Sequence, residues 1–220
     1  MSHPSRTLLG LAAAATLGAG LACASASAAT LEVSALQRNG KPLAGAVITL
    51  EAQPPLLPPI APLQAVIDQV GLAFAPDVLV VPVNSSVRFP NSDAVSHQVY
   101  SFSPARKFQL PLYRGKPYPP VTFDEPGIVT LGCNIHDRML AYIVVTAAPF
   151  FGRTDAAGHW SASELPAGRY QLTLWHPLLH EAQVPGQVVE VSREQESVEL
   201  RLTKPLRPAP LTGRPHSWDY

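Results

Sequence analysis

Sulfur, net charge and long apolar runs are all scarce in this sequence. Its 220 residues include two cysteines and two methionines, and with neutral histidines the formal net charge is zero. A neutral chain gives no indication of a nucleic-acid partner. No segment offers the roughly 20 uninterrupted apolar residues that a transmembrane helix needs. A Ser-His-Asp arrangement, a paired carboxylate motif and a phosphate loop are also missing, so we do not expect an enzyme.

Residues 1–28 have the pattern of an export signal. Arg6 precedes an apolar run, and small residues follow up to Ala28. We therefore predict cleavage near Ala28 and a periplasmic protein, with a lipid anchor at Cys23 as the lesser alternative. Loss of this segment leaves Cys133 as the only cysteine, which excludes an internal disulfide. A lone thiol in an oxidising compartment is open to damage unless it is buried or metal-bound, which favours a ligand role.

The composition indicates an all-β protein. Its 24 prolines and 14 glycines, scattered among short Val, Ile and Leu runs, argue against long helices. Asn39-Gly40 predicts a hairpin turn between strands at 31–37 and 46–52, because these residues tolerate the positive φ of such turns. Prolines between 54 and 59 end this first unit.

A second set of short strands is expected further along the chain. The expected strands are 65–70, 78–83, 86–89, 97–102, 127–131 and 140–145. Residues 103–120 are polar and rich in proline, and we expect a surface loop there. After Pro149 the alternation at 164–175 and the runs at 187–191 and 197–202 predict three more strands.

One short loop holds three side chains that bind metals. Cys133, His136 and Met139 lie within the seven residues CNIHDRM, and Met139 is the only methionine beyond the initiator. His97 opens a predicted strand and is the candidate for a second imidazole. Two imidazoles, a thiolate and a weak axial thioether are the ligand set of a blue-copper centre. We predict one copper ion held by His97, Cys133, His136 and Met139, since a single thiolate with a thioether does not suit zinc.

Each of these residues also has an ordinary role. A lone Cys is usually a small buried hydrophobic residue, a lone Met fills gaps in a core, and a surface His is solvated. Their occurrence together favours copper over these separate roles. The other histidines, His159, His176, His180 and His216, are expected to be structural or solvated, because Pro177 interrupts the one helical spacing among them.

Residues 63–145 resemble a cupredoxin. The resemblance is carried by FPNSD at 89–93, before the first histidine, and by the CNIHDRM loop. The loop histidine has two residues between it and the cysteine and two between it and the methionine. This spacing is similar to that in amicyanin, the type found in methylamine utilisation, whereas plastocyanin has a longer gap to its methionine. The resemblance implies a Greek-key sandwich in which His136 carries electrons out. It also implies that the residue after the first histidine supports the cysteine sulfur through its amide; that residue is usually Asn and is Gln98 here.

The flanking segments resemble a carboxypeptidase regulatory-like module, which is a transthyretin-like β-sandwich. Its two halves would carry NGKPLAGAV at 39–47 and the strand pattern of 154–175. The cupredoxin would then be an insertion in, or be flanked by, this sandwich. The predicted divisions are a signal at 1–28, a cupredoxin domain at 63–146, a sandwich from 29–54 and 147–203, and a proline-rich tail at 204–220.

These features predict a monomeric electron carrier. It would move one electron at a time from a redox donor to an acceptor, such as a dehydrogenase, a cytochrome or an oxidase. Copper storage or delivery through the same ligands is one alternative, and a non-redox binding module built on the flanking sandwich is another. Four basic residues could form a rim that steers an acidic partner, or simply a solvated loop: Arg106, Lys107, Arg114 and Lys116.

Overall fold

The computed structural model describes residues 29–209 except 56, 59, 116–117, 181–183 and 193–194. All regular elements among these residues are strands, so the predicted all-β class is confirmed. The described part of the chain therefore contains no helix that could cross a membrane. The predicted export signal and the end of the tail, residues 210–220, lie outside the described residues.

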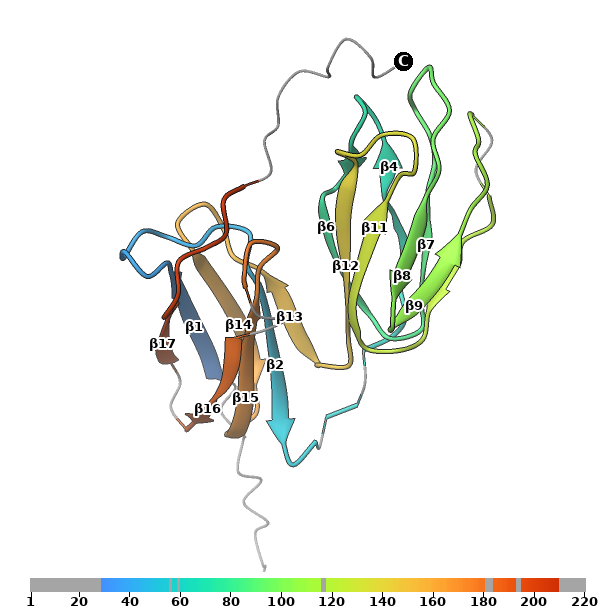
Figure 1. Cartoon of the computed structure of the whole chain (residues 1–220). Coiled ribbons are helices and arrows are strands. Elements are labelled where there is room, and N and C mark those ends of the chain that lie inside the picture. The colour runs from blue at the N-terminus through green and yellow to red at the C-terminus, as the bar shows by residue number, and fades with distance from the viewer. Residues whose placement is uncertain are drawn as a thin grey trace, which may run out of the picture.

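Strands from both ends of the chain form two sheets that face each other (Figure 1). The first sheet consists of β14 (His159–Leu165), β1 (Ala29–Leu36) and β17 (Gln195–Arg201) in that order. The second consists of β13 (Phe150–Arg153), β2 (Val47–Gln53), β15 (Gly168–Trp175) and β16 (Val184–Val191). Each sheet thus joins strands that precede and follow the middle of the chain.

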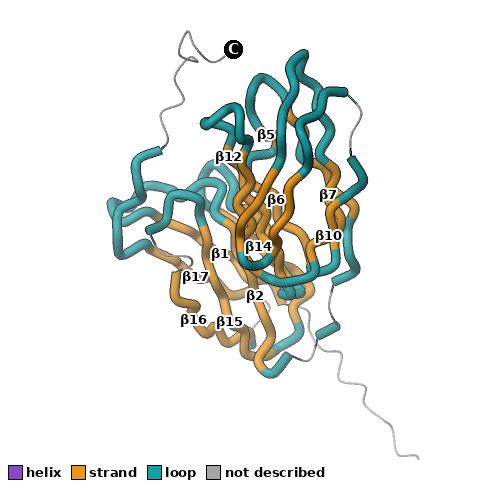
Figure 2. Tube along the Cα trace, turned by 45° about the vertical axis from the view of Figure 1, so that its right-hand side comes forward, coloured by secondary structure: helices purple, strands orange, loops and turns teal. Residues whose placement is uncertain are grey.

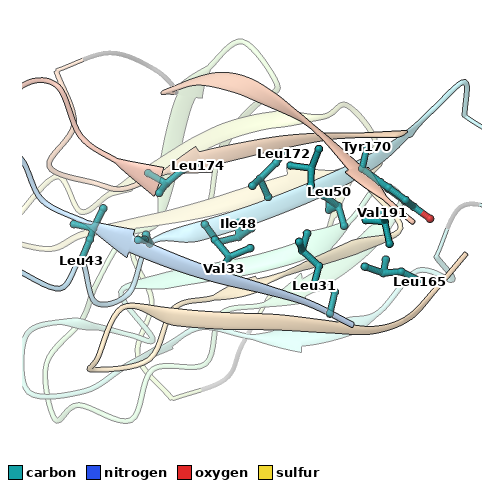
Figure 3. Packing of buried hydrophobic residues seen from close by; sticks show 14 of the residues in the cluster. Leu31, Val33, Leu43, Ile48, Leu50, Leu165, Tyr170, Leu172, Leu174 and Val191 are labelled. Carbon is teal, nitrogen blue, oxygen red and sulfur yellow. The ribbon is translucent and has the colours of Figure 1, made fainter. Parts of the chain in front are cut away.

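An apolar core lies between these two sheets (Figure 3). Successive side chains of a strand point to opposite faces, and β1 follows this rule with alternately buried and half-buried residues. Leu31 and Val33 of β1 therefore share one core with Ile48 and Leu50 of β2. Burying each such side chain contributes about 1.5–3 kcal/mol, which is enough to fix the register of both sheets.

The middle of the chain forms a second sandwich. Its larger sheet has the order β6 (Val78–Pro82), β12 (Leu140–Thr146), β11 (Gly127–Gly132), β8 (Tyr100–Ser103) and β9 (Arg106–Gln109). The smaller sheet has the order β10 (Val121–Phe123), β7 (Ser85–Arg88) and β3 (Gln64–Val66). A short hairpin of β4 (Asp68–Gln69) and β5 (Phe74–Ala75) lies beside them. Figure 2 shows loops crowding the end of this sandwich near β5.

The two sandwiches are packed against each other through a third apolar cluster. Val144 of β12 belongs to this cluster and Tyr142 packs on it, whereas Ile143 between them belongs to the core of the second sandwich. From the first sandwich, Trp175 of β15 joins the cluster, and its ring lies 5.2 Å from that of Tyr142. Both faces of β12 are therefore covered, which explains its nearly continuous apolar sequence.

The structure corrects the expectation of a surface loop at 103–120. Residues 106–109 form β9, which pairs antiparallel with β8. Phe108 explains the difference, because it packs on the second core and stacks against Phe89 at 5.7 Å. Further along, Tyr113 is buried and pairs with His97. The prolines and charges of this segment led to the expectation of a loop, whereas the stacking of Phe108 on Phe89 stabilises β9 as a strand.

Candidate metal centre

Cys133, His136 and Met139 lie in the loop that joins β11 to β12. These strands pair antiparallel up to Gly132 opposite Leu140, so the seven residues between them close the end of a hairpin. The N–H of Met139 donates to the carbonyl of His136 at 3.0 Å, which forms a tight turn. Cys133 and Met139 are both buried in the second core, while His136 is half-buried. The hairpin thus turns the two sulfur side chains inward and leaves the imidazole near the surface.

His97 comes from a different segment, between β7 and β8, and is fully buried. Its backbone exchanges two hydrogen bonds with Tyr113, at 3.0 and 2.9 Å. Asn91 ties the same region together, since its side-chain amide donates to the carbonyls of Val95 and Tyr113. Together these hydrogen bonds hold the main chain of His97 beside the β11–β12 loop.

Three of the four predicted ligands converge. The Nδ1 atoms of His97 and His136 are 3.0 Å apart, and the Sγ of Cys133 lies 3.7 Å from Nδ1 of His136. All three ligand atoms lie within 4.8 Å of one another. Atoms bound at about 2.0–2.3 Å to one tetrahedral metal ion lie roughly 3.3–3.6 Å apart. The observed separations fall on either side of that range, so the side chains fit a shared ion with small adjustments.

Met139 is placed beside this group. It shares the second core with Cys133 and is 2% exposed, and both residues line one surface hollow. A buried thioether next to a thiolate is suitably placed for a weak axial contact. Its ligation remains a prediction, as does that of the other three residues.

A backbone donor supports the cysteine sulfur. The N–H of Gln98 points to the Sγ of Cys133 at 3.5 Å. The predicted amide contact is therefore present, although residue 98 is Gln and not Asn, because the contact needs only the main chain. Such a hydrogen bond stabilises the thiolate and helps to fix its orientation.

The sequence reasoning missed Asp93. Its Oδ2 lies 2.8 Å from Nε2 of the buried His97, and its two oxygens also accept hydrogen bonds from the N–H groups of Gly71 and Leu72. Burial raises the pKa of the Asp93 carboxyl, but the hydrogen bonds from Leu72, His97 and Gly71 outweigh it and lower the pKa. The sequence does place this carboxylate four residues before a candidate ligand. Only the fold shows that its side chain contacts the imidazole of His97.

Other candidate residues lie elsewhere. Among the described residues, His97, Cys133 and His136 are the only group of three or more His, Cys or acidic side chains close enough to share an ion. Nδ1 of His176 accepts a hydrogen bond from the N–H of Leu178 instead. Of the four basic residues of the proposed rim, Arg106 forms an ion pair with Asp124 at 3.2 Å. Lys116 and His216 lie outside the described residues.

Comparison with known proteins gives partial similarities. No family model and no curated protein matches the sequence. Among solved structures, a purple cupredoxin from Nitrosopumilus maritimus is 23% identical and matches 37% of this chain and 99% of its own, with a TM-score of 0.33. A copper-containing nitrite reductase from Thermus scotoductus is 27% identical over 51% of this chain and 28% of its own, with a TM-score of 0.36. An amicyanin variant in the Cu(I) state is 22% identical over 38% of this chain and 82% of its own, with a TM-score of 0.35.

Proposed function

We propose that this protein is an exported type 1 copper protein that carries single electrons between redox partners. The observation that supports this most directly is the convergence of two Nδ1 atoms and one Sγ atom within 4.8 Å. A copper ion bound there would supply a one-electron couple, and the chain would supply the fixed ligands. His97 and Cys133 come from different segments of the chain and are both buried, so the packing around them resists rearrangement between oxidation states.

The residues around the group favour electron transfer over substrate chemistry. Four side chains would surround the ion, and Met139 and Cys133 are almost fully buried. No coordination position is then left for a substrate, so we propose no catalytic role. His136 is half-buried and is the ligand nearest to solvent, which makes its imidazole the proposed path for electrons to a partner. The described residues contain one such group, with one thioether beside it, which also favours a carrier over a store for several ions.

The finer assignments belong to the same proposal. They are a periplasmic location, a protein donor and acceptor, a monomer, and the amicyanin type of centre. We also propose that residues 63–146 form the copper domain and that residues 29–54 and 147–203 form the transthyretin-like sandwich around it. The pairing of β2 with both β13 and β15 supports this division, because strands from before and after the middle segment share a sheet.

Copper binding and optical spectroscopy test the proposal. We expect the protein loaded with Cu(II) to show an intense blue thiolate-to-copper band and a narrow hyperfine splitting in electron paramagnetic resonance. Cys133→Ser should abolish both signals, because the thiolate generates them. The control is His159→Ala, which removes an exposed imidazole of β14 and should leave both signals unchanged. A colourless wild-type complex, or a blue Cys133→Ser complex, would contradict the proposal.

A further inference from the structure

We propose that Asp93 is a positioning residue for His97. Its carboxylate keeps the imidazole proton on Nε2, leaves the lone pair of Nδ1 directed at the ligand group, and lowers the reduction potential of the bound metal. The effect on the potential rests on the proposed function, whereas the effect on the proton does not. Residues that hydrogen-bond to a metal-binding histidine commonly fix its tautomer and raise its basicity.

The contact between the two side chains is short and shielded from water. Nε2 of His97 and Oδ2 of Asp93 are 2.8 Å apart, and the side chains are 0% and 14% exposed. An ionised carboxylate can only accept hydrogen bonds. Nε2 must therefore carry a proton, and in the neutral imidazole Nδ1 then presents a lone pair 3.0 Å from Nδ1 of His136. The same ring thus faces a carboxylate with one nitrogen and the ligand group with the other.

A turn between β4 and β5 holds the carboxylate in place. Its residues Gly71 and Leu72 both have positive φ, +64° and +59°, and the value at Leu72 is uncommon for a residue with a side chain. This conformation directs two successive N–H groups at Asp93, with distances of 2.6 Å from Gly71 and 3.0 Å from Leu72. The N–H of Asp93 in turn donates to Oδ1 of Asn91. The carboxylate is anchored independently of His97, which is what a residue that orients another side chain requires.

The charge of Asp93 should favour the oxidised metal. A negative group on the far side of the imidazole increases electron donation from Nδ1, and Cu(II) gains more from this than Cu(I). If removing the charge lowers the ratio of Cu(II) to Cu(I) binding tenfold, the reduction potential of this one-electron couple rises by about 59 mV. Changes in such supporting residues typically weaken metal binding by about 10–100-fold. We therefore expect a higher potential and weaker Cu(II) binding when the carboxylate is replaced.

The test compares Asp93→Asn with a matched control, Asp68→Asn. Asp68 is a nearby carboxylate on β4 that accepts hydrogen bonds from Ser92 and Gln69. Both variants remove one negative charge, but the control leaves the Asp93–His97 contact intact. Voltammetry of the copper-loaded proteins measures the potential. Nitrogen-15 NMR of the metal-free proteins identifies the protonated nitrogen of His97, which requires no copper.

Two results would support the inference. His97 should carry its proton on Nε2 in the wild type and in Asp68→Asn, and a mixture of tautomers should appear in Asp93→Asn. The reduction potential of Asp93→Asn should rise by at least the amount that corresponds to a tenfold change in the ratio of Cu(II) to Cu(I) binding. This rise should be clearly larger than the change in potential of Asp68→Asn. Equal potentials in the two variants, or a wild-type proton on Nδ1, would overturn it. A wild type that forms no blue complex would overturn the proposed function, and the NMR result would still decide the role of Asp93.

Discussion

Buried polar side chains form a connected network beneath the candidate metal centre. The hydroxyl of Tyr113 donates to the carbonyl of Phe89 and accepts a hydrogen bond from Nε2 of Gln69, which also reaches the carbonyl of Pro90. Burial raises the pKa of Tyr113 to about 12, so the phenol stays neutral and can donate. Because each buried polar contact would be costly to lose, the network holds the backbone of the 89–97 segment rigid.

His176 provides a residue-scale prediction about pH. Burial lowers its pKa below the ordinary 6.5 and Arg153 adds to this, while a backbone contact with Ala44 and the charge of Asp77 oppose it. The unfolded chain then binds a proton at a pH where the folded protein does not. We expect the stability due to the neutral ring to be present above pH 6.5 and to be lost as the pH falls toward the lowered pKa.

Urea unfolding of metal-free protein at pH 7.5 and pH 5 measures this effect. Between these values the wild type should lose more stability than His176→Gln, which cannot be protonated. The control is His159→Gln, which makes the same substitution at an exposed position of β14. Equal losses in the wild type and in His176→Gln would refute the assignment.

At the scale of the element, the hairpin of β11 and β12 depends on its neighbour β8. Gly132, the last residue of β11, pairs with Tyr100 of β8, and the Tyr100 ring lies across the glycine. A Cβ at position 132 would lie 2.8 Å from the end of that ring, too close for normal packing. Glycine immediately before Cys133 therefore leaves room for the Tyr100 ring in its present position.

A double-mutant cycle tests this contact. Gly132→Ala should destabilise the protein by about 1–3 kcal/mol, the usual cost of overpacking. In the background of Tyr100→Ala the same substitution should cost clearly less, since the clash is gone. Free energies of unfolding from urea titrations give the interaction energy. An equal cost of Gly132→Ala in both backgrounds would show that the tyrosine ring does not require the glycine.

At the scale of the whole molecule, the sheets form successive layers with apolar clusters between them. The third apolar cluster, which lies between the two sandwiches, contains residues from both of them: Val47, Val78, Val144 and Trp175. Arg153 of β13 adds a polar contact, since its guanidinium donates to the carbonyl of Val78 at 3.2 Å. An interface of this apolar character should make the two sandwiches unfold together.

Val144→Asp tests the cooperation between the sandwiches. The side chain of Val144 is 3% exposed and faces the interface, so a carboxylate there is desolvated unless the sandwiches separate. We expect one calorimetric transition in the wild type and two in Val144→Asp. The smaller change Val144→Thr should weaken the interface and retain a single transition. Two transitions in the wild type, or one in Val144→Asp at an unchanged temperature, would contradict strong coupling.

The sequence by itself determined the strand class and the chemistry of the candidate ligands in the loop. Proline spacing and β-alternation are local properties, and Cys133, His136 and Met139 are close in the chain, so a hairpin brings them together. The tertiary structure alone decided the rest. Packing of Phe108 on the core made a strand of an expected loop. The position of Asp93 on His97 depends on a turn at 71–72, twenty-one residues or more earlier, whose N–H groups meet the carboxylate only in the folded chain.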